Sequence, residues 1–99
     1  MVFKNIRLVE KNFQMNLFIN YYDDPNRQDE LLKCLKSNLS MSLIKKVIVF
    51  NESKNLIKHK KIVVKNVSNR PTYQDFFDAT KDYPEEVNII ANADIIFRS

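Results

Sequence analysis

Glycine is absent from this chain of 99 residues, although average usage would supply about seven. The GxGxxG dinucleotide loop, the Walker A phosphate loop and the GxSxG nucleophile elbow all need glycine, for close backbone approach or for a positive φ. The sequence therefore excludes these three motifs. We expect asparagine, which tolerates the left-handed region, to replace glycine wherever the chain needs that conformation.

Cysteine and long apolar runs are also scarce. Cys34 is the single cysteine, which excludes an internal disulfide and a cysteine-based zinc site and fits a reducing compartment. The longest uncharged apolar runs, such as residues 47–50 and 89–91, are too short to cross a bilayer or to form a signal peptide. We therefore expect a cytoplasmic protein that does not enter a membrane.

The charge is positive overall but unevenly distributed. The chain has a net charge of +4 and 44% apolar residues, a balance typical of a globular domain. Residues 1–70 carry fourteen Lys or Arg against six Asp or Glu, whereas residues 71–99 carry two against six. The densest basic run, residues 58–61, lacks the interleaved aromatic side chains that stack on bases. These features argue against nucleic acid as a partner.

The hydrophobic pattern predicts an α/β fold. Runs rich in β-branched and aromatic residues alternate with stretches of helical spacing. We expect strands at residues 16–22, 46–50, 61–67 and 87–97, and helices at residues 27–38 and from Thr72-Tyr73 onward. The result is a Rossmann-like, mostly parallel sheet of about four strands flanked by two or three helices. Residues 15–99 would form this single domain, and residues 1–14 an N-terminal extension that is an edge strand or an arm.

Two helical faces and one connection bear on this topology. Leu31, Leu35 and Leu39 are spaced to form the buried face of the first helix, and Tyr73, Phe76 and Phe77 should form an aromatic stripe that packs the second helix on the sheet. The connection from Phe50 to Lys61 is barely long enough for a parallel crossover, which takes at least about ten residues. An irregular loop there would allow antiparallel pairing and an α+β fold.

The topology itself selects candidate site residues, because ligands of open parallel sheets bind beyond the carboxyl ends of the strands, where the strand order reverses. The residues that follow the expected strands are Tyr21, Tyr22, Asp23, Asn51, Glu52, Ser68, Asn69, Arg70 and Asn92–Asp94. Arg70 and the free N–H groups of the helix that starts near Thr72 would together attract an anion. The alternative is that Arg70 pairs with a carboxylate and Thr72 only caps its helix.

Asp94 is a second candidate, because a carboxylate inside an apolar stretch costs about 2–5 kcal/mol unless it is paired. On an extended chain, Asn92 and Asp94 would project from the same face and offer two oxygen ligands of the type that Mg²⁺ or Mn²⁺ prefers. A diphosphate and water would have to complete such a shell. We expect Asp94 and Arg70 to border one hollow; the alternative is that Asp94 simply ends its strand and faces solvent.

Four segments together resemble the N-terminal half of a GT-A-type glycosyltransferase, over about residues 15 to 97. They are residues 17–22, the helix start at residues 27–30 with Cys34-Leu35, residues 70–77, and residues 89–95. In that superfamily a Rossmann-like half binds a nucleotide sugar, and a D-x-D motif after the fourth strand holds a divalent cation on the diphosphate. The resemblance implies that Asn92-Ala93-Asp94 is the D-x-D counterpart, with Asp94 the main ligand of a Mn²⁺ or Mg²⁺ ion.

The same resemblance implies roles for the other strand-end residues in nucleotide binding. Tyr21 and Tyr22 would lie near the base and ribose, Asn51 or Glu52 near the nucleoside, and Arg70, beside Thr72, near the phosphates. The sequence departs from the family where the first motif carboxylate is an amide and where Arg98 replaces a further acid, and both changes weaken metal binding. The acceptor half of such an enzyme follows this region.

These features lead to two functional hypotheses. The first is a truncated nucleotide-sugar-binding domain that is incomplete as an enzyme, because no residue is assigned as the catalytic base. The second is a non-catalytic structural or interaction module that has kept the fold and self-associates through the face where the missing half would dock.

Overall fold

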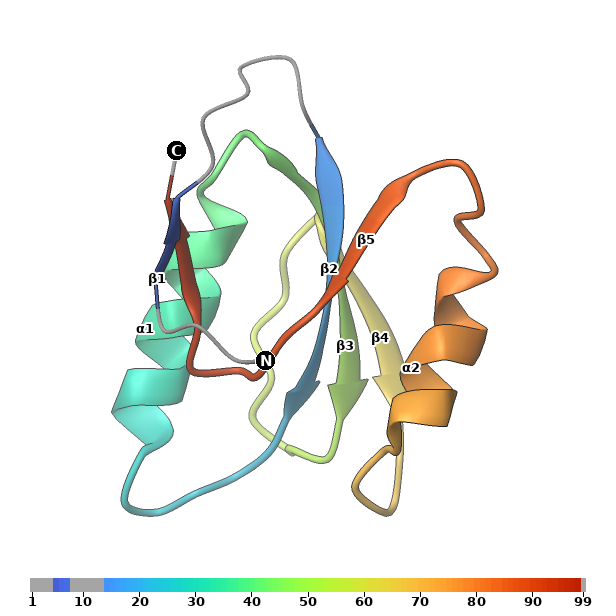
Figure 1. Cartoon of the computed structure of the whole chain (residues 1–99). Coiled ribbons are helices and arrows are strands. Elements are labelled where there is room, and N and C mark those ends of the chain that lie inside the picture. Colours follow the sequence, from blue (N-terminus) through green and yellow to red (C-terminus); the bar gives the residue numbers. More distant parts are fainter. Residues whose placement is uncertain (1–4, 8–13, 99) are drawn as a thin grey trace.

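The computed structural model describes residues 5–7 and 14–98 of the chain (Figure 1). The elements are, in order, β1 (Asn5–Arg7), β2 (Met15–Tyr21), α1 (Gln28–Leu39), β3 (Ile44–Asn51), β4 (Ile62–Asn66), α2 (Tyr73–Thr80), β5 (Val87–Ile90) and β6 (Ile96–Arg98). The predicted strands and both predicted helices are present, although the last strand differs from the expectation.

Four of the strands form one parallel sheet in the order β4-β3-β2-β5. β2 pairs with β3 along its whole length, from Met15 opposite Ile44 to Tyr21 opposite Asn51. On its other side, Met15 to Phe18 pair with Val87 to Ile90 of β5. The strand order therefore reverses at β2, as it does at the centre of a Rossmann-like fold, and the predicted fold class is confirmed.

One helix covers each face of this sheet (Figure 1). Because successive side chains on a strand point to opposite faces, Leu17, Ile19 and Tyr21 pack in the core under α1, whereas Phe18 packs in the core under α2. Leu31, Leu35 and Leu39 form the buried face of α1, as their spacing predicts. The central strands are buried on both faces, which explains their nearly continuous apolar sequence.

The connection between β3 and β4 contains no helix, yet the two strands pair in parallel, from Val47 opposite Ile62 to Asn51 opposite Asn66. The antiparallel alternative is therefore wrong. Leu56 and Ile57 of the connecting loop pack against the core on the α1 side. The loop thus covers the sheet face that a crossover helix would otherwise cover.

The expected strand at residues 87–97 is broken in two. β5 ends at Ile90, and a turn follows in which the Ile95 N–H donates to the Asn92 carbonyl oxygen at 3.2 Å. β6 then leaves the main sheet and pairs in parallel with β1, which shows residues 5–7 as a strand of a separate two-stranded sheet. The other residues of the expected 1–14 extension lie outside the described residues, apart from Gln14. Asparagine and aspartate favour turns, so the break falls in the segment that holds Asn92 and Asp94.

The aromatic stripe of α2 is only partly buried. Phe76 packs on the sheet with its ring centroid 4.7 Å from that of Phe50, but Tyr73 and Phe77 are 71% and 56% exposed. The helix contacts the sheet through Phe76 and Ala79 instead, so its buried face is rotated away from the predicted one. In the described part of the chain, neither helix is long and apolar enough to cross a membrane.

No residue in the described ranges has a positive φ. The expectation that asparagine would supply left-handed residues therefore has no instance there. Helix α1, for example, ends at Ser40 in the right-handed helical region, with its N–H bonded to the last carbonyls of the helix. The turns of the described chain are built without the conformation that glycine favours.

Asn38 joins α1 to the segment around β6. Its side chain is 3% exposed. The amide nitrogen Nδ2 donates to the Ile95 carbonyl oxygen at 2.8 Å, and Oδ1 accepts from the Phe97 N–H at 2.9 Å. One buried side chain thus satisfies two backbone groups of a segment that lies outside the main sheet.

Replacing Asn38 with alanine should lower the free energy of unfolding by about 2–4 kcal/mol, because both backbone groups would be left buried and unpaired. Urea denaturation followed by circular dichroism measures this change. Asn69→Ala removes the same atoms from an exposed loop position and should change stability by less than about 0.5 kcal/mol. Equal effects of the two substitutions would contradict the role assigned to Asn38.

Candidate functional site

A hollow of about 420 Å³ lies at the carboxyl edge of the sheet, where the strand order reverses between β2 and β5. We call it the switch-point hollow. Its lining residues come from the end of β2, the start of α1, the loop before α2 with the first turn of that helix, and the segment after β5. They are Asn20, Tyr22, Arg27, Arg70, Pro71, Tyr73, Phe76 and Ile90–Ile95. This is the position at which open parallel sheets bind ligands.

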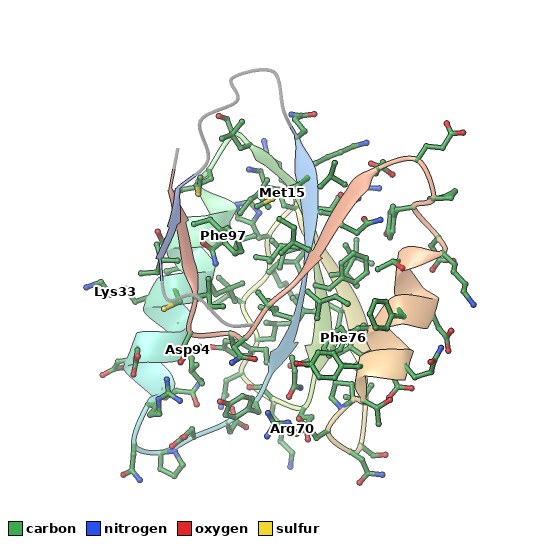
Figure 2. All side chains as sticks on the ribbon, in the orientation of Figure 1. Met15, Lys33, Arg70, Phe76, Asp94 and Phe97 are labelled. Atoms are coloured by element: carbon green, nitrogen blue, oxygen red, sulfur yellow. The ribbon has the colours of Figure 1, made fainter. Side chains whose placement is uncertain are left out.

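Arg70 and Asp94 both line this hollow, as the topology predicts. Arg70 is exposed in the loop between β4 and α2, and Asp94 lies in the turn between β5 and β6. Figure 2 shows Arg70 near the carboxyl ends of β2 and β3, and Asp94 higher in the same view, beside the lower part of α1. Tyr22, Asn92 and Ala93 line the same hollow, so five of the residues selected from the sequence are brought together.

Asp94 is held in an ion pair. Its Oδ2 accepts from Nη2 of Arg27 at 2.9 Å, and the two side chains are 21% and 37% exposed. Its Oδ1 is covered from solvent and has no hydrogen-bond partner within the described ranges. The alternative in which Asp94 ends a strand and faces solvent is therefore wrong. So is the premise of an extended chain, because residues 92–95 form a turn.

Arg27 is a site residue that the sequence reasoning missed. It is the residue before α1 and makes no capping hydrogen bond with its side chain. A cation is disfavoured at the positive end of a helix dipole, so its presence there was a usable signal of another role. Hydrogen bonds to Glu30 and then to Asp94 raise the pKa of Arg27 above its ordinary value, and the guanidinium is charged at all accessible pH.

Tyr21 is the last residue of β2 and Tyr22 follows the strand, and the two side chains have different surroundings. Tyr22 lines the switch-point hollow, whereas Tyr21 is buried in the core under α1 and does not line it. The Tyr21 hydroxyl accepts from Nε2 of Gln28 at 3.2 Å. Burial raises the pKa of Tyr21 above its ordinary value. Since Leu17 and Ile19 share its face, the strand period of two explains this outcome.

Asn51 and Glu52 do not line the hollow either. Asn51 is buried, and its side-chain amide bonds the Ser53 backbone N–H and carbonyl and the Oδ1 of Asn66. It therefore shapes the loop after β3. Glu52 accepts from Nδ2 of Asn20 at 2.9 Å, and Asn20 does line the hollow. Glu52 thus acts on the hollow indirectly, by orienting Asn20.

Thr72 caps helix α2 and does not line the hollow. Its side-chain oxygen accepts from the Asp75 N–H at 3.2 Å, and the Asp75 carboxylate accepts from the Thr72 N–H at 2.8 Å. This is the capping box that the sequence predicts. The box satisfies two of the free N–H groups expected to attract an anion and adds a negative charge, so Arg70 is the stronger anion-binding feature of this loop.

The two residues expected to hold a divalent cation both line the hollow, but the donor set does not fit such an ion in this arrangement. One oxygen of Asp94 is bonded to Arg27 and the other is covered from solvent. Asn92 is exposed and offers a single amide oxygen. Within the described residues, no three His, Cys, Asp or Glu side chains are grouped so that they could hold a metal ion.

Comparisons of this chain with protein-family models, with curated proteins and with solved structures found no match. The candidate site is therefore defined by its own geometry. Its polar lining, counted over residues 5–7 and 14–98, is two arginines, one carboxylate, two tyrosines and two asparagines.

The pair between Arg27 and Asp94 should be measurable by a double-mutant cycle with Arg27→Gln and Asp94→Asn. We expect the double variant to lose less stability in urea denaturation than the two single variants added together. Because both side chains are partly exposed, the coupling should fall at about 1 M NaCl, where the Debye length is about 3 Å. Additive effects at low salt would show that the pair contributes nothing to the fold.

Proposed function

We propose that this chain is a nucleotide-sugar-binding domain of the GT-A glycosyltransferase type, which holds its donor in the switch-point hollow. One observation carries the proposal. Arg70 and Asp94 come from loops after two different strands and line one hollow where parallel sheets bind ligands.

The chemistry of the hollow suits the parts of such a donor. The Arg70 guanidinium matches a phosphate, which it can bind with two parallel hydrogen bonds. Tyr22 and Tyr73 offer aromatic faces for a base or a sugar ring. Asn20 and Asn92 offer amides for hydroxyl groups. The volume of about 420 Å³ also falls within the usual range of small-molecule sites, about 300–1,000 Å³.

Donor binding is the whole of the proposed activity. Transfer of a sugar needs a general base that takes the proton of the acceptor hydroxyl. Asp94 is the one carboxylate among the described residues that line the hollow, and it is paired with Arg27. We therefore assign no catalytic residue, and a transferase reaction would depend on an acceptor-binding half of the kind that follows this region in GT-A enzymes.

Titration of ¹⁵N-labelled protein with UDP and with GDP, in EDTA and in Mg²⁺, tests the proposal. We expect shifts of the backbone amides near Tyr22, Arg70 and Asp94, and Arg70→Gln should weaken binding about tenfold because a charge-assisted hydrogen bond is lost. Lys33→Gln is the matched control, since Lys33 is exposed on the outer side of α1 and points away from the hollow (Figure 2).

The absence of shifts at millimolar UDP and GDP in both buffers would contradict donor binding. Equal weakening by Arg70→Gln and Lys33→Gln would contradict the role of Arg70 and indicate a non-specific effect of charge.

A second candidate function is a self-associating interaction module. The observation that favours it is the exposure of two aromatic side chains, Tyr73 and Phe77, which lie one turn apart on α2. The chain also exposes Val64 on the edge strand β4. The exposed neighbours Tyr73 and Phe77 favour contact with a second protein surface.

For this second function, sedimentation velocity should show an average mass that rises with protein concentration. Phe77→Gln should shift the protein toward monomer, because it removes the exposed aromatic ring without touching the buried face of α2. Gln74→Ala, on the same helix and exposed, is the control and should leave the distribution unchanged. A monomer at all concentrations would exclude the module hypothesis.

A further inference from the structure

We infer that the switch-point hollow binds the diphosphate of its nucleotide ligand without a divalent cation, through the guanidinium groups of Arg27 and Arg70. In this arrangement, Arg27 takes the position on Asp94 that a metal ion would occupy. The inference rests on the proposed function, because it concerns how the same hollow holds the same class of ligand.

The state of Asp94 is the first argument. A hydrated cation needs an accessible carboxylate oxygen, but Oδ2 is bonded to Arg27 at 2.9 Å and Oδ1 is covered from solvent. The positive charge that balances Asp94 is therefore supplied by the protein itself. Asn92 stands where the D-x-D motif has its first carboxylate, and it offers only an amide oxygen. The hollow therefore lacks a second anionic ligand at this position.

The position of Arg27 is the second argument. It lies directly before α1, where the helix dipole disfavours a cation, and it does not cap the helix. Arg27 nevertheless lies there, in contact with the carboxylates of Glu30 and Asp94, and the pair with Asp94 is the less exposed of the two. Those contacts keep its guanidinium in the lining of the hollow. Arg70, in the loop before α2, lines the same hollow.

The unused hydrogen-bond capacity of Arg27 is the third argument. Nε and Nη2 donate to the two oxygens of Glu30 at 3.2 and 3.4 Å, and Nη2 also donates to Asp94. Nη1 donates to none of the described residues. The side chain of Glu30 is 53% exposed, so this pair is weak and exchangeable. A phosphate oxygen can therefore bind Nη1, or replace Glu30, while Arg27 keeps its bond to Asp94.

The net charge of the lining agrees with this assignment. Arg27 and Arg70 contribute two positive charges against the single negative charge of Asp94. A diphosphate carries more than one negative charge, and planar guanidinium groups bind phosphate oxygens in pairs of hydrogen bonds. The two arginines come from different segments, Arg27 from directly before α1 and Arg70 from the loop before α2, so both can contact one ligand.

Binding of UDP and of GDP to the whole chain, measured by calorimetry in EDTA and again with Mn²⁺, tests the inference. We expect binding in EDTA that Mn²⁺ does not improve. Arg27→Gln should weaken it about tenfold or more, whereas Lys33→Gln, on the same helix, should not. Glu30→Gln should tighten binding about two- to threefold, because it removes the negative charge that competes with phosphate for Arg27.

The opposite response of Arg27→Gln would overturn the inference. If Asp94 serves a metal ion, removing Arg27 frees its carboxylate, and the variant should bind UDP at least as well as the parent protein in Mn²⁺. Binding that requires Mn²⁺ in the parent protein would also overturn it while leaving the proposed function intact. No binding of either nucleotide in either buffer would overturn both. The amide spectrum of each variant shows whether it is folded.

Discussion

The side chain of Asn38 sets the position of the chain's last segment, and the geometry of the site follows from it. A parallel sheet alone would let the chain continue straight beyond β5. Two hydrogen bonds from a buried amide instead hold residues 95–97 against α1, so the preceding turn lies beside the start of that helix. There Asp94 meets Arg27. A polar contact inside the core thus determines which charges face each other at the sheet edge.

Much of the fold could be predicted from the sequence because its signals are local. Each helix is indicated by residues within it: α1 by the spacing of Leu31, Leu35 and Leu39, and α2 by the capping box at Thr72. The break within residues 87–97 could not be predicted in this way, because apolar residues on both sides of Asn92 and Asp94 read as one strand. It is set by β6 pairing with β1 and by Asn38, which are distant in sequence. The buried face of α2 likewise depends on how the helix lies on the sheet.

Strand direction and strand order were enough to predict part of the candidate site. The rule of strand ends placed Tyr22, Arg70, Asn92 and Asp94 in one hollow, since it depends only on strand direction and order. This rule does not distinguish residues that line the hollow from residues that are buried beside it or that hold the neighbouring loops. Tyr21 was predictable as a core residue from the two-residue period, but the hydrogen bonds of Asn51 and the pairing of Arg27 require knowledge of contacts between distant segments.

The lack of glycine bears on the unfolded chain as well as on the folded one. Every residue carries a β-carbon, and all described residues have negative φ. Glycine loses more backbone freedom on folding than any other residue, so a chain without it starts from a narrower set of disordered conformations. Ordering the loops that carry Arg70 and Asp94 therefore costs less backbone entropy than it would with glycine at the same positions.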